Sequence, residues 1–133
     1  MAVTHVMAPS ELGMQYQKMR IDAATMNIAN ANVVQPSDGS GFKPLTVQMA
    51  LPSFEQILAG TEEPQMVALD VANKQVFQPD HPAADSRGYV HYANIDLAQQ
   101  MVTLNQATRA YEANVKAFNA QMNMTLKAME IGK

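Results

Sequence analysis

The sequence predicts a mainly α-helical protein with a small irregular β insertion. Two long terminal helices are expected to pair as a coiled-coil-like hairpin, with a loop- and β-rich segment between them. Residues 94–131 contain no glycine or proline, and residues 10–33 contain a single glycine, whereas six of the seven prolines lie at positions 36–82. Because both residue types interrupt helices, we divide the chain into an N-terminal helix (1–34), a loop-rich small β insertion (35–93) and a long C-terminal helix (94–133).

The first helix is expected to begin after Pro9, with Ser10 as its N-cap, and to end near Val33. Two mainly apolar stripes along it predict contact with more than one neighbour. Their members are Leu12, Tyr16, Met19, Ala23, Met26, Asn30 and Val33 in one stripe, and Ile21, Ala24, Ile28 and Ala31 in the other. A buried amide at Asn30 could fix the register between helices; the alternatives are an exposed residue or a C-terminal cap.

The middle segment is rich in turn-forming residues, such as SDGSG at 37–41. Three short runs at 45–49, 66–71 and 74–77 are candidate strands. Segments of this length predict at most two or three strands in a small, irregular β region.

The last helix carries a heptad-like seam, apolar except for two threonines. Its members are Leu97, Met101, Leu104, Thr108, Tyr111, Val115, Phe118, Met122, Thr125 and Met129. At about 1.5 Å per residue such a helix would reach roughly 57 Å, more than a small domain needs. Its polar positions are mostly Asn and Gln, which can be packed against protein at a lower desolvation cost than charges. The helix is therefore expected to contact other subunits, with Arg109 either an interface anchor or a simple partner for Glu112.

Composition excludes several classes of function. A net charge of −3 with scattered basic residues gives no nucleic-acid footprint, and there is no cysteine for disulfides or thiol chemistry. No apolar run approaches the ~18 residues of a membrane span, and the first eight residues do not resemble a cleaved secretory signal. No catalytic motif occurs in a convincing context, so we expect neither an enzyme nor a bound cofactor.

The segment HPAAD at 81–85 is predicted to be a rigid turn. Pro79 and Pro82 fix φ, Asp85 can accept backbone hydrogen bonds, and Gly88 supplies conformational freedom, with His81 inside the turn. The alternative is a metal site formed with His91, which the irregular spacing and the two prolines disfavour.

Two stretches carry a family resemblance. Residues 76–114 read VFQPDHPAADSRGYVHYANIDLAQQMVTLNQATRAYEAN, and residues 27–31 read NIANA. Both resemble the bacterial flagellar basal-body rod proteins, of the proximal-rod type, over nearly the whole chain. Ala93, Gln100 and Thr108 depart from the family pattern.

The resemblance implies a structural subunit of the flagellum, located in the periplasm-spanning rod of the basal body. It implies export in an unfolded state by the flagellar type III apparatus, without a cleaved signal peptide, followed by helical polymerisation. The implied partners are other copies of the chain, other rod proteins and the export apparatus, with no nucleic acid and no direct membrane insertion. The alternatives are another axial rod protein, or a small metal-binding protein that uses the His81 and His91 region.

On this interpretation the subunit interface is formed by the two terminal helices. The residues expected in it are Leu12, Tyr16, Met19, Met26, Asn27, Asn30, Leu97, Met101, Leu104, Arg109, Tyr111, Asn114, Val115, Phe118 and Met122.

Overall fold

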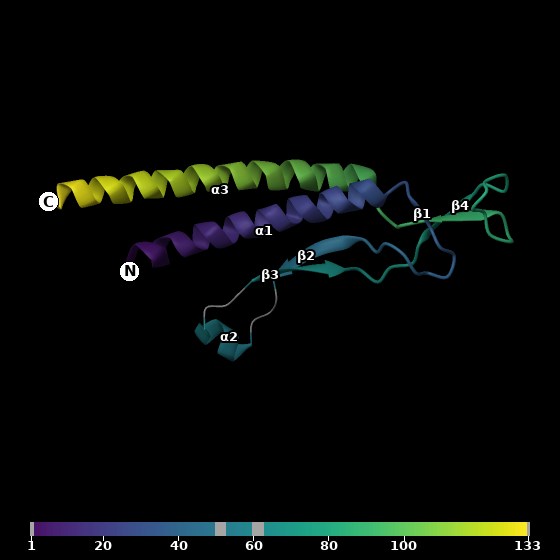
Figure 1. Ribbon diagram of the computed structural model, residues 1–133, viewed down its shortest axis with the longest axis horizontal. Coiled ribbons are helices and arrows are strands. Elements are labelled where there is room, and N and C mark those ends of the chain that lie inside the picture. The colour runs from purple at the N-terminus through teal and green to yellow at the C-terminus, as the bar shows by residue number, and fades with distance from the viewer. Residues whose placement is uncertain (1, 50–52, 60–62, 133) are drawn as a thin grey trace.

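Two long helices lie side by side and antiparallel along the molecule (Figure 1). They are α1, Ala2–Asn30, and α3, Leu97–Ile131. The computed structural model describes residues 2–49, 53–59 and 63–132, and gives the positions of side chains from residue 11 onward except for 56 and 57. The described ends of the chain lie at the same end of the helix pair (Figure 1). The prediction of a mainly helical protein with a small β insertion is confirmed.

The first helix begins earlier than predicted. It starts at Ala2 and continues through Pro9, so Ser10 lies inside the helix and is not its N-cap. Proline's fixed φ of about −65° is compatible with an α-helix, although inside one it removes a backbone hydrogen bond and crowds the carbonyl four residues earlier. Helical residues on both sides of Pro9 therefore outweigh the local stop signal.

The insertion forms two small antiparallel sheets. Strands β1 (Val34–Gln35), β5 (Tyr89–Tyr92) and β4 (Lys74–Phe77) make one sheet in the order β1-β5-β4, and β2 (Leu45–Met49) pairs with β3 (Pro64–Ala68) in the other. The predicted bounds of β2 and β4 are correct, whereas β3 lies at 64–68 and not at 66–71. Strands β1 and β5 and the short helix α2 (Phe54–Ala59) were not predicted.

The predicted seam of α3 is covered in its middle and exposed toward both ends. All five members from Leu104 to Phe118 are half-buried as expected, but Met101 and Met122 are 49% and 40% exposed. The residues that point toward α1 instead each lie one position earlier. They are Gln100, which bonds to α1, the fully buried Ala107, and Asn114, which lies against Gly13.

Small side chains explain this offset. Ala23 and Ala24 of α1 and Ala107 of α3 are buried, and a Cβ added to Gly13 would lie 3.2 Å from Asn114 Nδ2. Such residues allow two helices to approach closely, which a row of methionines would prevent. The fully buried apolar residues of the two helices are therefore alanines, and the larger seam residues are at most half-buried.

Helix α3 begins at Leu97, three residues later than predicted, and a side-chain cap fixes this start. Asp96 is extended, and its Oδ1 accepts hydrogen bonds from the backbone N–H groups of Ala98 and Gln99 at 3.1 and 3.3 Å. At the other end the cap residue Gly132 has φ −78°, and its backbone N–H donates a hydrogen bond to the Ala128 carbonyl. The N-terminal cap thus sets where the chain leaves the β insertion and enters the helix.

We predict that Asp96→Ala lowers the free energy of unfolding by about 1 kcal/mol, because two N–H groups at the helix start lose their acceptor. Urea unfolding followed by circular dichroism at 222 nm measures the change. Asp96→Asn is the matched control, since asparagine caps about as well as aspartate. Equal losses in the two variants would contradict the capping role.

Candidate functional site

A single buried asparagine joins the two long helices to the β insertion. Asn27 on α1 is 1% exposed. Its Nδ2 donates hydrogen bonds to the Leu45 carbonyl at 2.8 Å and to Gln100 Oε1 at 3.0 Å, and its Oδ1 accepts one from the Leu45 N–H at 2.8 Å. We call Asn27, Leu45 and Gln100 the amide clasp. It ties α1, β2 and α3 together at one point.

The clasp satisfies each polar group it buries. The asparagine side chain bonds to both backbone groups of Leu45, as the peptide group of a neighbouring strand would. Leu45 opens β2, whose other edge pairs with β3. The amide therefore completes the hydrogen bonding of β2 on the side that faces α1, and it fixes the β2–β3 hairpin on the helix.

The amide that fixes the register is not the one predicted for that role. Asn30 is half-buried, and its Nδ2 bonds to the Met26 carbonyl within the same helix. Asn27 makes the contacts between elements. Nothing local in the sequence indicates that the backbone of Leu45 approaches it, because the two residues are separated by the end of α1 and a long loop.

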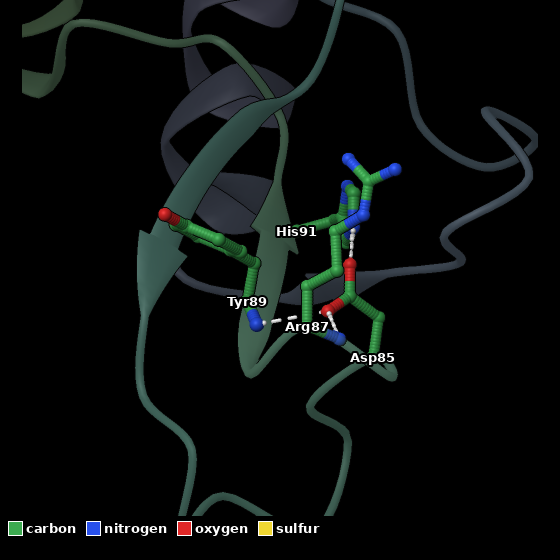
Figure 2. A network of polar contacts seen from close by, with 4 residues as sticks. All are labelled: Asp85, Arg87, Tyr89 and His91. Carbon is green, nitrogen blue, oxygen red and sulfur yellow. Dashed lines mark hydrogen bonds and ion pairs between the residues drawn. The ribbon is translucent and has the colours of Figure 1, made fainter.

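A second polar network lies in the loop that joins β4 to β5 (Figure 2). Asp85 Oδ1 accepts hydrogen bonds from the backbone N–H groups of Arg87 and Tyr89, both at 2.9 Å, and Oδ2 lies 3.0 Å from Nε2 of His91. These bonds hold the loop against the strand that follows it. The hydrogen bond from the Tyr89 N–H, followed by that from His91, keeps the pKa of the Asp85 carboxyl below its ordinary value.

The rest of this loop is a series of tight turns. His81 Nδ1 accepts a hydrogen bond from the Ala83 N–H at 3.0 Å, so this imidazole serves the turn. Gly88 has φ +84°, and an added Cβ would lie 3.0 Å from Phe77 Cε2. Only glycine fits both the conformation and the space. The loop precedes β5, and so leads into α3 only after one more strand.

The chemistry of this loop is structural. His91 is buried and bonded to Asp85, and the described residues contain no group of three or more side chains suited to hold a metal ion. Arg109, Glu112 and Lys116 are exposed and form no ion pair with one another within the described part of the chain. The polar groups of both networks bond to backbone and to each other.

The predicted interface residues differ widely in exposure. Asn27 is buried. Half-buried residues are Leu12, Tyr16, Met19, Asn30, Leu104, Tyr111, Asn114, Val115 and Phe118, and exposed ones are Met26, Leu97, Met101, Arg109 and Met122. Their role between subunits stays a prediction. Gln100 and Gly13, which position the helices, were not among the predicted site residues.

Comparison with known proteins identifies the class. A family model described as flagellar basal body rod FlgEFG protein C-terminal matches residues 86–131, which include β5 and the whole of α3. The C-terminal part of the chain is therefore similar to that of flagellar rod proteins.

Relatives identify the family more closely. The chain is 33% identical to the flagellar basal-body rod protein FlgC of Yersinia enterocolitica, over 95% of this chain and 93% of the relative. It is 31% identical to FlgC of Bacillus subtilis over the full length of both, and 34% identical to FlgC of Aquifex aeolicus over 93% and 92%. The chain belongs to the FlgC family of flagellar basal-body rod proteins, and it is a structural subunit of that rod. Over its described residues, no helix combines the length and apolar character needed to span a bilayer.

We predict that Asn27→Asp lowers the free energy of unfolding by about 3 kcal/mol at neutral pH. A carboxylate has no N–H group to donate. The Leu45 carbonyl oxygen and Gln100 Oε1 would therefore lose their donor and face a negative charge. Asn30→Asp is the matched control, because that amide bonds only within its own helix. Chemical unfolding of both variants measures the difference. Free energies of unfolding that fall equally, to within about 0.5 kcal/mol, would show that the clasp does not stabilise the fold as proposed.

We predict that acid lowers the stability of the protein through protonation of Asp85 in the β4–β5 loop. Because the folded pKa is lowered, this carboxylate contributes stability above the unfolded pKa of about 4, and the contribution is lost as the pH falls through the folded value. Asp85→Asn should therefore be less stable than the unsubstituted chain at neutral pH, and the gap should shrink below about pH 4. Thermal unfolding as a function of pH measures it, with exposed Asp70→Asn as the control. A gap that does not change with pH would contradict the assignment.

Proposed function

We propose that this chain assembles helically in the proximal rod through faces of α1 and α3 that are not covered within a single copy. The observation that carries the proposal is a row of side chains at seven-residue intervals on α3: Met101, Thr108, Val115 and Met122. We call it the methionine flank. Both of its methionines are exposed and Thr108 and Val115 are half-buried, although the sequence pattern is that of a helix–helix seam.

The position of the flank supports contact with another subunit. Gln100, Ala107 and Asn114, each one residue before a member of the flank, face α1. Gln99 and Thr103 line a groove on the side of the β2–β3 hairpin. At about 100° per residue, the flank therefore lies beside α1 on the side away from the hairpin. Exposed apolar rows of this kind mark interaction surfaces.

The flank suits neighbours of more than one sequence. Methionine has three rotatable bonds and a polarisable sulfur, so it can repack against different partners. The partners in this proposal are other copies of the chain and other rod proteins. A contact between two different surfaces generates an open helical array when its rotation does not close into a ring, and that is the geometry of a rod. The coiled-coil-like packing predicted for the terminal helices belongs to this proposal.

A modest core supports export before folding. The buried apolar residues between α1 and α3 are alanines, which bury little area each. A chain with this core and an uncovered flank would gain part of its order only on docking. We propose that the flagellar type III apparatus exports it unfolded, without a cleaved signal peptide, and that it acts in the periplasm-spanning rod as a structural component and not as an enzyme.

We predict that Met101→Glu or Met122→Glu reduces incorporation into basal bodies by about tenfold or more, because the new charge would be buried against a neighbour. Gln106→Glu places the same charge on the opposite flank of α3 and should be incorporated normally. Immunoblots of isolated basal bodies, normalised to another rod protein, measure incorporation. Normal levels of both methionine variants would refute the proposed interface.

A further inference from the structure

The three-stranded sheet β1-β5-β4 stands apart from the rest of the molecule. Over the described residues, no Cα atom of its strands lies within 8 Å of one in either long helix or in the β2–β3 hairpin. Figure 1 shows β1 and β4 beyond the end of the helix pair. A groove of about 530 Å³ separates Val76 and Tyr92 of the sheet from Ala31 and Leu97 at the helix ends. Close packing against the helices therefore does not set the orientation of this sheet.

The connections of the sheet leave one direction of rotation open. Its neighbouring strands β1 and β5 are joined to the two long helices by the short segments 31–33 and 93–96. These two segments lie side by side and can act as a hinge. The angle about this hinge depends on how the sheet is joined to the β2–β3 hairpin. The first part of that connection, residues 36–41, reads PSDGSG, a composition typical of a flexible linker.

A buried glutamine on β1 bypasses this linker. Gln35 is 6% exposed, its Oε1 accepts a hydrogen bond from the Phe42 N–H at 2.8 Å, and its Nε2 donates one to the Val33 carbonyl at 3.1 Å. The chain approaches this side chain so closely at Gly41, which has φ +116°, that an added Cβ would collide with Gln35 Oε1. The glutamine therefore holds Phe42 beside the sheet, whatever conformation residues 36–41 adopt.

The amide clasp holds the chain in the same way a few residues further on. The backbone N–H of Leu45 donates to Asn27 Oδ1 at 2.8 Å, as that of Phe42 does to Gln35. Between Phe42 and Leu45, Pro44 is buried, its φ is fixed by its ring, and its carbonyl accepts a hydrogen bond from the Leu69 N–H at 2.8 Å. Two buried amides thus hold the two ends of one short, restrained segment.

We infer that Gln35 is a positioning residue, which together with Asn27 sets the angle between the three-stranded sheet and the helix pair. Asn27 fixes one end of the segment 42–45 on α1, and Gln35 fixes the sheet to the other end. Figure 1 shows the β4–β5 loop at the far end of the sheet from the helices, so a small change in this angle displaces the loop most. The inference goes beyond the proposed function, because it concerns the geometry of a single copy.

Distances between two spin labels test this role, since the chain has no cysteine of its own. Labels on Ser86→Cys in the β4–β5 loop and Gln106→Cys on α3 occupy exposed positions and report the orientation of the sheet. Double electron–electron resonance on the purified full-length chain should give one narrow distance distribution. Gln35→Met should broaden it about twofold or more, because residues 36–41 then act as a flexible linker. Gln75→Met is the matched control and should not, since Gln75 lies in the same row of the sheet but is exposed.

Two glycines outside the sheet supply a second comparison, which does not depend on a substitution within β1. Gly41→Ala should broaden the same distribution, because the new methyl group displaces Gln35 Oε1. Gly39 also has a positive φ, +82°, but an added Cβ would meet no atom within 4 Å. Gly39→Ala therefore strains the same loop without displacing the glutamine, and it should leave the distribution unchanged.

Labels on Asp22→Cys and Gln106→Cys, which both lie on the helix pair, should keep one distance in every variant. A change in that distance would overturn the inference, because the substitutions would then act on the helices and not on the angle of the sheet. A broad distribution in the chain that carries only the labels would also overturn it, as would equal widths in the two test variants and their controls. Each of these results leaves the proposed assembly through the methionine flank standing, since that surface lies on α3.

Discussion

The close approach of α1 and α3 constrains the rest of the molecule. Gly13, Ala24 and Ala107 bring the helices together, and the amide of Asn27 locks them by bonding to Gln100 and to both backbone groups of Leu45. Because small and amide side chains fill the space between the helices, the methionines of α3 cannot lie there. They remain on its outer flank.

Large apolar side chains stay exposed in two places. Met101 and Met122 of the methionine flank are exposed on α3, and Phe54 and Leu58 are exposed on α2. The β4–β5 loop has the opposite character, because Asp85 holds it with bonds to the Arg87 and Tyr89 backbone and to His91. Rigid turns and an internally satisfied clasp position the insertion, while flexible methionines form the surface proposed to meet varied neighbours.

The sequence predicted the architecture because its signals are local. The absence of glycine and proline in 94–131, and their density in 36–82, predicted the two helices and the insertion, and β2 and β4 follow from short runs of strand-forming residues. The offset of the helix seam was missed because periodicity ranks positions by hydrophobicity, and Ala107 and Gln100 rank low. The clasp was missed because it depends on a backbone group brought to Asn27 by the path of the chain. The two-residue strand β1 has no sequence signal of its own.

The most direct test of the central claim is a density map of isolated basal bodies in which this chain and its neighbours are resolved. The account predicts that Ala107 still packs on α1 of the same copy, while Met101, Val115 and Met122 are covered by an adjacent subunit. It would be contradicted by a map in which those three side chains face solvent, or in which α3 leaves its own α1 to pair with a neighbour.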